Sequence, residues 1–127
     1  MKIEQLRRVI ARCISLDPND DFGMEKCWEE MTDILSEDIH DTILFFNNDC
    51  TDEELYWLGS VFEDVAEKTQ SNDFIKVLRE RLARVSQSAY AQQSFVSEHM
   101  RKWVDFPEFI RSISSDIDFA EEKINSQ

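Results

Sequence analysis

The chain has 127 residues with 27 Asp or Glu against 14 Lys or Arg, and its formal net charge of -13 opposes direct binding to nucleic acids and to anionic membranes. This length suits one domain, and a hydrophobic content of 42% with nine Phe and three Trp argues against disorder. The presence of only two Gly and two Pro argues against turn-rich β-sandwiches and β-barrels.

Every substantial segment has hydrophobic residues at the spacing of an amphipathic helix, and no segment has the alternation of a strand. The expected helices cover residues 2–16, 21–35, 37–47, 51–68, 71–86, 89–104 and a last segment that begins near residue 105. The sequence therefore predicts an all-α fold, a single-domain bundle of about six to seven helices over residues 1–127 with no sheet.

Several residues mark the ends of these helices. Pro18 disfavours helical backbone at the residue before it and so ends the first helix, and Ser36 is the expected N-cap of the third. Thr51 and Glu54 have the spacing of a capping box, and residues 105–108 repeat that pattern. Gly59 falls inside the expected fourth helix, where we expect it to allow close approach of another helix or to make room for a partner.

The three cysteines, Cys13, Cys27 and Cys50, are an odd number without a Cys-x-x-Cys pair. Each lies in or beside a hydrophobic periodic stretch, where a free cysteine behaves as a small buried hydrophobic residue. The N-terminus has no apolar core of a signal peptide, and no run is long enough to span a membrane. These features predict a cytoplasmic protein with free cysteines.

Residues 17–23 are rich in Asp and Asn and begin like a calcium-binding loop. With Asp17 at its first position, however, Phe22 replaces the turn glycine and Trp28 replaces the bidentate glutamate. We therefore interpret this segment as a helix-to-helix turn.

No other pattern indicates catalysis. His40 and His99 lie far apart in the sequence, and two glycines, Gly23 and Gly59, do not make a phosphate-binding loop. Acidic residues are plentiful, but a catalytic pair also needs burial or a shifted pKa, which abundance does not indicate. The sequence predicts no catalytic residue, no metal site and no cofactor, so we expect that the protein is not an enzyme.

The acidic residues are concentrated in residues 17–67, the acidic segment. It holds 17 acids and one base, Lys26, for a net charge of -16, whereas the other 76 residues hold 10 acids and 13 bases. Such asymmetry is consistent with a solvated surface that aids solubility, but it favours docking of a basic protein. The expected contact residues, with an aromatic anchor among them, are Glu29, Asp33, Glu37, Glu53, Tyr56 and Glu63.

The basic residues of the expected helix over residues 71–86 need a separate explanation. Lys76, Arg79, Arg81 and Arg84 occur close together, with Glu80 among them. We favour pairing with the acidic segment over an anion-binding site, at about 0–1 kcal/mol for each exposed pair.

One stretch also resembles a known family. Tyr56 to Val85 reads YWLGSVFEDVAEKTQSNDFIKVLRERLARV, about a quarter of the chain, and the similarity lies in the Leu58-Gly59 step, residues 62–64 and residues 74–81. It resembles a segment of the small helical immunity proteins of bacterial contact-dependent growth inhibition and other polymorphic-toxin systems. The resemblance implies a cytoplasmic, non-enzymatic antitoxin that binds the C-terminal domain of its cognate toxin, commonly a nuclease. It assigns no binding residue.

The charge distribution and the resemblance lead to the same hypothesis. A nuclease has a basic substrate cleft, which a carboxylate-rich surface can occupy in place of phosphates, and we expect a monomer that forms a one-to-one inhibitory complex without turnover. An acidic adaptor or nucleic-acid mimic that binds a basic host protein is the alternative. A metal-dependent all-α hydrolase is a third hypothesis, and it predicts a stoichiometric divalent metal ion.

Overall fold

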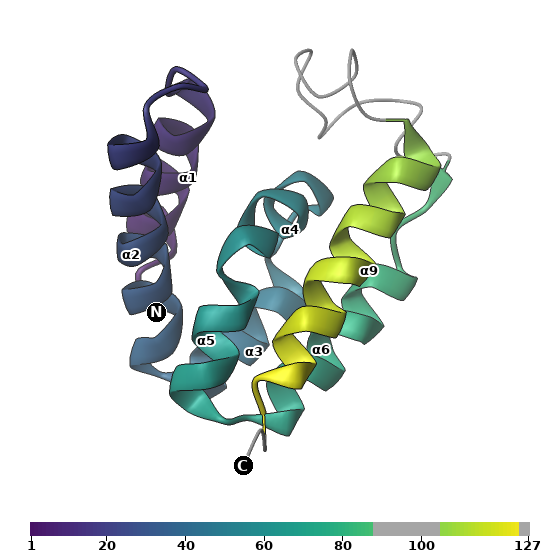
Figure 1. The fold of residues 1–127 in the computed structure, drawn as a ribbon. Coiled ribbons are helices and arrows are strands. Elements are labelled where there is room, and N and C mark those ends of the chain that lie inside the picture. The colour runs from purple at the N-terminus through teal and green to yellow at the C-terminus, as the bar shows by residue number, and fades with distance from the viewer. Residues whose placement is uncertain (88–104, 125–127) are drawn as a thin grey trace.

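The computed structural model describes residues 1–87 and 105–124, and these residues form an all-α bundle without strands (Figure 1). The expected helix over residues 89–104 lies outside the described residues. The helical elements are α1 (Ile3–Ser15), α2 (Asp21–Glu37), α3 (Ile39–Asn48), α4 (Asp52–Leu58), the 3₁₀ turn η1 (Gly59–Val61), α5 (Phe62–Thr69), α6 (Asn72–Ala83) and α9 (Phe106–Glu122). Within the described residues, no helix is long and apolar enough to cross a membrane.

The helices are arranged so that α2 has a neighbour on each side. It packs against α1 and against α5, while α9 packs against both α5 and α6, and α3 packs against α6. Figure 1 shows the pair of α1 and α2 at one side of the molecule and the pair of α6 and α9 at the other. The seam between α2 and α5 therefore joins the α1–α2 pair to the rest of the bundle.

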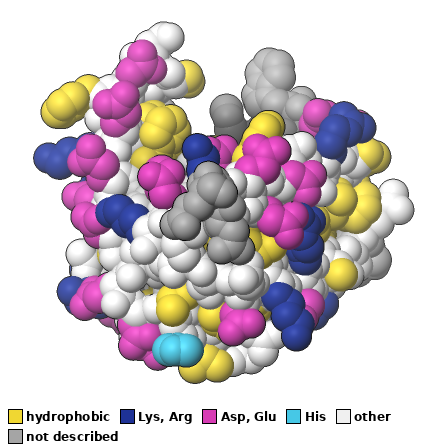
Figure 2. All heavy atoms as spheres, turned by 60° about the horizontal axis from the view of Figure 1, so that its bottom comes forward, with side chains coloured by type: hydrophobic (Ala, Val, Ile, Leu, Met, Phe, Trp, Pro, Cys, Tyr) yellow, Lys and Arg dark blue, Asp and Glu magenta, His cyan; other side chains and the backbone are white. Residues whose placement is uncertain are grey.

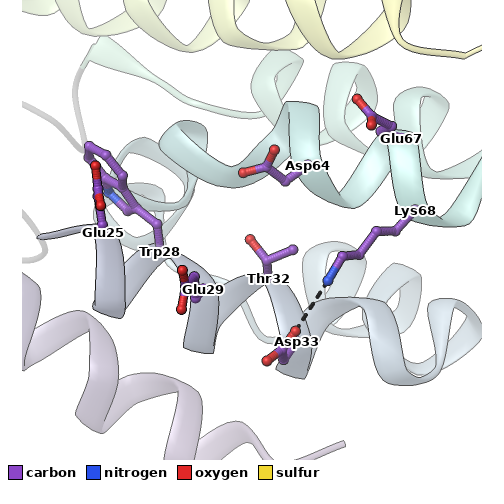
Figure 3. Close-up of a pocket in the computed structure, with 8 residues that line it drawn as sticks. All are labelled: Glu25, Trp28, Glu29, Thr32, Asp33, Asp64, Glu67 and Lys68. Atoms are coloured by element: carbon purple, nitrogen blue, oxygen red, sulfur yellow. Dashed lines mark hydrogen bonds and ion pairs between the residues drawn. The ribbon is translucent and has the colours of Figure 1, made fainter.

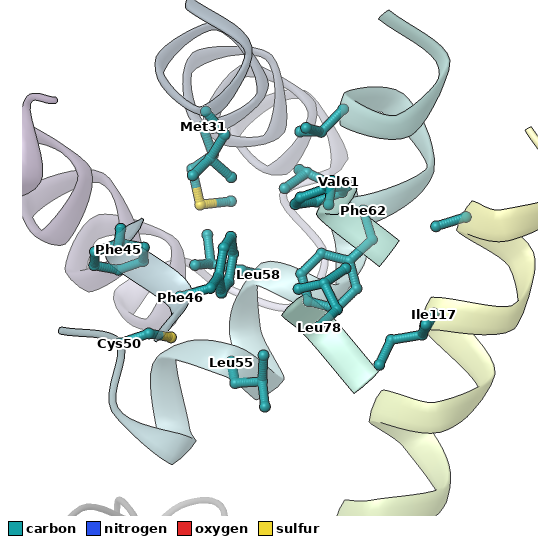
Figure 4. Close-up of a cluster of buried hydrophobic side chains, with 14 of the residues drawn as sticks. Met31, Phe45, Phe46, Cys50, Leu55, Leu58, Val61, Phe62, Leu78 and Ile117 are labelled. Carbon is teal, nitrogen blue, oxygen red and sulfur yellow. The ribbon is translucent and has the colours of Figure 1, made fainter. Parts of the chain in front are cut away.

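The core contains a cluster of four phenylalanines from three helices. The ring of Phe46 meets those of Phe45, Phe62 and Phe74 edge to face, with centroids 5.3, 6.0 and 5.9 Å apart. Leu58 lies in the same cluster and is completely buried (Figure 4). Because such edge-to-face pairs add to the gain from burial, this cluster holds α3, α5 and α6 together.

The three cysteines lie in this hydrophobic interior. Cys13, Cys27 and Cys50 are all buried and free, as the sequence predicts. Burial raises the pKa of the Cys13 thiol and, more strongly, that of the Cys50 thiol, so both stay protonated.

The boundary between α2 and α3 differs from the prediction. Ser36 does not cap α3, because α2 continues to Glu37 and Asp38 takes the N-cap position. The carboxylate of Asp38 accepts hydrogen bonds from the backbone N–H groups of His40 and Asp41, at 3.1 and 3.3 Å. A carboxylate at this position also meets the positive end of the helix dipole, which favours it over a serine two residues earlier.

The helix expected over residues 51–68 is interrupted. Its capping box is confirmed, since the Glu54 N–H donates to Thr51 Oγ1 at 3.1 Å and the Thr51 N–H donates to Glu54 Oε1 at 2.9 Å. The α-helix then ends at Leu58, and the 3₁₀ turn that begins at Gly59 leads into α5.

Gly59 lies where α9 crosses this turn, which confirms the expected close approach. A Cβ added at Gly59 would collide with Oδ2 of Asp116 and lie 3.0 Å from its Cγ. The absence of a side chain at residue 59 therefore allows α9 to pack directly on the turn.

Candidate functional site

A groove runs along the seam between α2 and α5. It has a volume of about 510 Å³, and its lining side chains point into the gap from both helices (Figure 3). Residues three or four positions apart share one face of a helix, which is how α2 and α5 each present a row of polar side chains to the seam. We call this feature the acidic groove; it is lined by Glu25, Trp28, Glu29, Thr32, Asp33, Asp64, Glu67 and Lys68.

One end of the acidic groove is closed by an ion pair. Lys68 reaches from α5 towards α2, and its Nζ lies 3.2 Å from Oδ1 of Asp33 (Figure 3). Elsewhere in the groove, no basic group in residues 1–87 or 105–124 forms an ion pair with its carboxylates. These carboxylates without a cation are Glu25, Glu29, Asp64 and Glu67.

The floor of the acidic groove contains a buried hydroxyl without a partner. Thr32 is only 4% exposed, and its Oγ1 is buried without a hydrogen bond in the described part of the chain. The hydroxyls of Thr42 and Thr69, in contrast, donate to the backbone carbonyls of Leu35 and Val65 at 2.6 and 2.8 Å. Thr32 thus carries a polar group that the fold leaves unsatisfied, which costs about 1–3 kcal/mol.

An aromatic side chain lies at the other end of the acidic groove. Trp28 is partly buried against the core and lines the groove beside Glu25 (Figure 3). Phe22, less than one helical turn before Glu25, is 78% exposed. Phe22 does not line the groove, so Trp28 is the aromatic side chain that the groove itself presents.

The predicted contact residues do not form a single surface. Glu29 and Asp33 line the acidic groove, but Glu37 lies further along α2, where its Oε2 is 3.8 Å from Lys2 Nζ. Glu63 is on α5 but does not line the groove; burial and, to a smaller extent, the negative charge of Glu63 raise the pKa of the Asp116 carboxyl on α9.

The two predicted contacts on α4 lie in other places. The ring of Tyr56 stacks on Phe109 of α9, with centroids 5.2 Å apart and planes 9° from parallel. Glu53 lines a separate hollow with Arg7 and Thr51, between α1 and α4. The structure therefore brings only Glu29 and Asp33 of the expected set into the groove.

Six groove residues were missing from that set: Glu25, Trp28, Thr32, Asp64, Glu67 and Lys68. The helical spacing from Glu25 to Asp33 marks Trp28 and Thr32 as neighbours of the acidic stripe, and that signal was available in the sequence. Asp64 and Glu67 are adjacent because α5 packs on α2, which no local pattern indicates.

Among the described residues, the other acidic side chains of the acidic segment that form ion pairs lie outside the groove. Arg7 Nε lies 2.8 Å from Glu54 Oε2, and the N-terminal amino group lies 3.3 Å from Asp41 Oδ2. Arg12 pairs with Glu30. On the face shown in Figure 2, Lys and Arg side chains lie beside Asp and Glu side chains in several places. The described residues thus neutralise parts of the acidic segment and provide the groove with one cation, Lys68.

The basic residues of α6 and of its C-cap, Arg84, use several kinds of partner. Arg81 pairs with Asp52 of the acidic segment, as predicted, whereas Arg79 pairs with Asp118 and Glu121 of α9 at 3.1 and 2.9 Å. Arg84 donates to the carbonyl of Asn47 at 2.8 Å.

The turn over residues 17–23 contains hydrogen bonds within the chain. Oδ1 of Asp17 accepts from the Asn19 N–H at 2.8 Å, and Oδ1 of Asp20 accepts from the Gly23 N–H at 2.9 Å, which caps α2. Across the described ranges, no group of three or more His, Cys, Asp or Glu side chains is arranged to hold a metal ion. His99 lies outside those ranges.

The fold and the groove define a small all-α protein with a negatively charged, aromatic-edged groove, and this geometry suits the binding of cations. Comparisons with protein-family models, with curated proteins and with solved structures gave no match to this chain.

Proposed function

We propose that this protein acts by binding a basic protein through the acidic groove, and that the partner is the C-terminal toxin domain of a bacterial polymorphic-toxin system. The observation that carries the proposal is the set of four groove carboxylates that no described basic group neutralises. The resemblance of residues 56–85 to immunity proteins of these systems supports the identity of the partner.

The mechanism of inhibition would be occlusion. Residues four apart on a helix are about 6 Å apart along its axis, so Glu25 and Glu29 present regularly spaced negative charges on α2, and Asp64 and Glu67 add two more from α5. A basic cleft that is built for phosphates can accept such a set of charges. Opposite potentials also raise association rates towards about 10⁸–10⁹ M⁻¹s⁻¹ at low salt. Inhibition then requires only a one-to-one complex and no chemical step.

The experiment is a binding titration with the toxin domain encoded beside this gene, combined with growth protection in cells that express the toxin. The groove variant is Glu29→Lys/Asp64→Lys. The matched control is Glu4→Lys/Glu122→Lys, which makes the same change in net charge at exposed positions on α1 and α9. We expect the groove variant to lose about 100-fold in affinity, with a weaker salt dependence, and the control to lose far less.

Two results would contradict the proposal. Failure of the wild-type protein to bind or protect against the neighbouring toxin would exclude the immunity function. Equal losses in both double variants would show that net charge, and not the groove, determines binding. Capture of a polymerase, a histone-like protein or a restriction enzyme in place of a toxin would favour the alternative of an acidic adaptor or nucleic-acid mimic.

A further inference from the structure

The two ends of the acidic groove differ in what fills them. At one end, the aliphatic stem of Lys68 crosses from α5 and places its ammonium group against Asp33 (Figure 3). At the other end, Trp28 and the carboxylates of Glu29 and Asp64 line the groove without a cation from the described residues. The protein's own lysine shows that a long cationic side chain fits across the seam.

Thr32 lies on α2 between Trp28 and Asp33, and its side chain points into the gap between the helices (Figure 3). Its Oγ1 is buried and accepts no hydrogen bond from any described group. A ligand that donates to this atom would remove the cost of leaving a buried hydroxyl unsatisfied. This requirement selects for a ligand with a hydrogen-bond donor that penetrates to the floor of the groove.

The groove chemistry favours a guanidinium over an ammonium group or a metal ion. A guanidinium is planar, is more weakly hydrated than an ammonium, stacks on aromatic rings and carries five N–H donors in a fixed arrangement. It can therefore lie against Trp28 while it donates to Thr32 Oγ1 and to a carboxylate. A volume of about 510 Å³ is also much larger than a bare ion requires.

We propose that the open end of the acidic groove binds one arginine side chain of the partner protein, with its guanidinium against Trp28 and hydrogen-bonded to Thr32 Oγ1, Glu29 and Asp64. This inference rests on the proposed function for the existence of a basic partner. The arginine site itself is tested without the toxin.

The test uses three short blocked peptides that differ at one central residue, which is arginine, lysine or citrulline. Citrulline keeps the shape of arginine but lacks its charge. Binding is followed by NMR, from the indole N–H of Trp28 and the methyl group of Thr32. We expect the arginine peptide to shift both signals and to bind about 10-fold more tightly than the lysine peptide, with no saturable binding of the citrulline peptide.

Two variants separate the site from general attraction between charges. Thr32→Val keeps the shape of the side chain and removes the hydroxyl. We expect it to lower the affinity for the arginine peptide about fivefold without lowering the unfolding midpoint of the protein. Thr69→Val, on α5 outside the groove, is the matched control and should leave peptide affinity unchanged.

Equal affinities for the arginine and lysine peptides, or an unchanged arginine affinity in Thr32→Val, would overturn the inference. The peptide test and the toxin-protection test can fail independently of each other. Toxin protection without peptide shifts in the groove would refute the arginine site alone, and peptide binding without toxin protection would refute the immunity function alone.

Discussion

The acidic groove and the contact between α4 and α6 use carboxylates from the same acidic segment in opposite ways. At the α4–α6 contact, Arg81 pairs with Asp52, each side chain is only 11% exposed, and the same guanidinium donates to the Cys50 carbonyl at 2.9 Å. In the groove, Glu29 and Asp64 remain without a cation from the described residues. Negative charge in the described part of the chain therefore divides into carboxylates that stabilise the fold through ion pairs and carboxylates that no described cation neutralises.

The position of the basic residues determines this division. Among the described residues, the cations that pair with the acidic segment come from the N-terminal residues 1–2, from α1 and α6, and from Lys68 at the end of α5. Of these groups, only Lys68 reaches the α2–α5 seam, so most carboxylates of the seam have no counterion from residues 1–87 or 105–124. Of the 17 acids counted along the acidic segment, the five that line this seam are Glu25, Glu29, Asp33, Asp64 and Glu67.

Among variants that test this difference between the α4–α6 contact and the acidic groove, we expect Arg81→Ala to change the free energy of unfolding most. Removal of the guanidinium leaves the nearly buried carboxylate of Asp52 without its cation, and such a loss costs about 3–5 kcal/mol. Urea unfolding should show this drop in the free energy of unfolding, while toxin affinity of the folded variant stays near that of the wild type.

Arg111→Ala is the control for that variant. Arg111 is 67% exposed and pairs only with Glu108 of its own helix among the described residues, so its loss should cost less than about 1 kcal/mol. Similar costs for both variants would show that the α4–α6 pair is no more important than a surface pair.

Local patterns predicted the all-α fold and the Thr51–Glu54 capping box, because each depends on residues near one another in sequence. They also predicted the close approach at Gly59, but not its partner, Asp116 of α9, which is distant in sequence. They failed at Ser36, where a neighbouring aspartate is the better cap. They also could not show which carboxylates remain without a cation. Glu29 and Glu30 are adjacent in an acidic stripe, but only Glu30 meets Arg12, and that depends on how α1 packs on α2.

The carboxyl group of Asp116 is half-buried beside Gly59, an environment that differs from both the acidic groove and the α4–α6 contact. Burial, with a smaller contribution from the charge of Glu63, raises the pKa of Asp116 to about 6. Because the folded protein then binds this proton more tightly than the unfolded chain, the free energy of unfolding should fall as pH rises from about 4 to about 7. Allowing for solvent screening, we expect a loss of about 1–2 kcal/mol.

Asp116→Asn should remove this component of the pH dependence and make the protein more stable than the wild type at neutral pH. Denaturant unfolding at a series of pH values measures both effects, and Glu122→Gln, at an exposed position on the same helix, is the control. A variant that keeps the wild-type slope would show that the stability of the bundle does not depend on the protonation of Asp116.

The contact between Gly59 and Asp116 should also appear as an energetic coupling. In the Asp116→Ala background, Gly59→Ala should raise the free energy of unfolding by up to about 1 kcal/mol, because alanine favours helical backbone. In the wild type, the new methyl group meets the Asp116 carboxyl, so the gain should be absent or reversed. A double-mutant cycle measures the difference. A coupling near zero would mean that α9 does not constrain this turn.

The smallest effects are expected from neutralising the acidic groove itself, and they test the comparison most directly. Glu29→Gln and Asp64→Asn remove like charges that face one another across the seam, so each should raise the free energy of unfolding by a few tenths of a kcal/mol at low salt. Glu54→Gln, which weakens the charge-assisted hydrogen bond from Arg7, should instead lower the free energy of unfolding by about 1 kcal/mol.

Added salt should reduce the increase in the free energy of unfolding of the groove variants, because salt screens the repulsion that these variants relieve. If Glu29→Gln destabilised the protein as Glu54→Gln does, the groove carboxylates would be part of the fold's own ion pairing and would not be free to bind a partner.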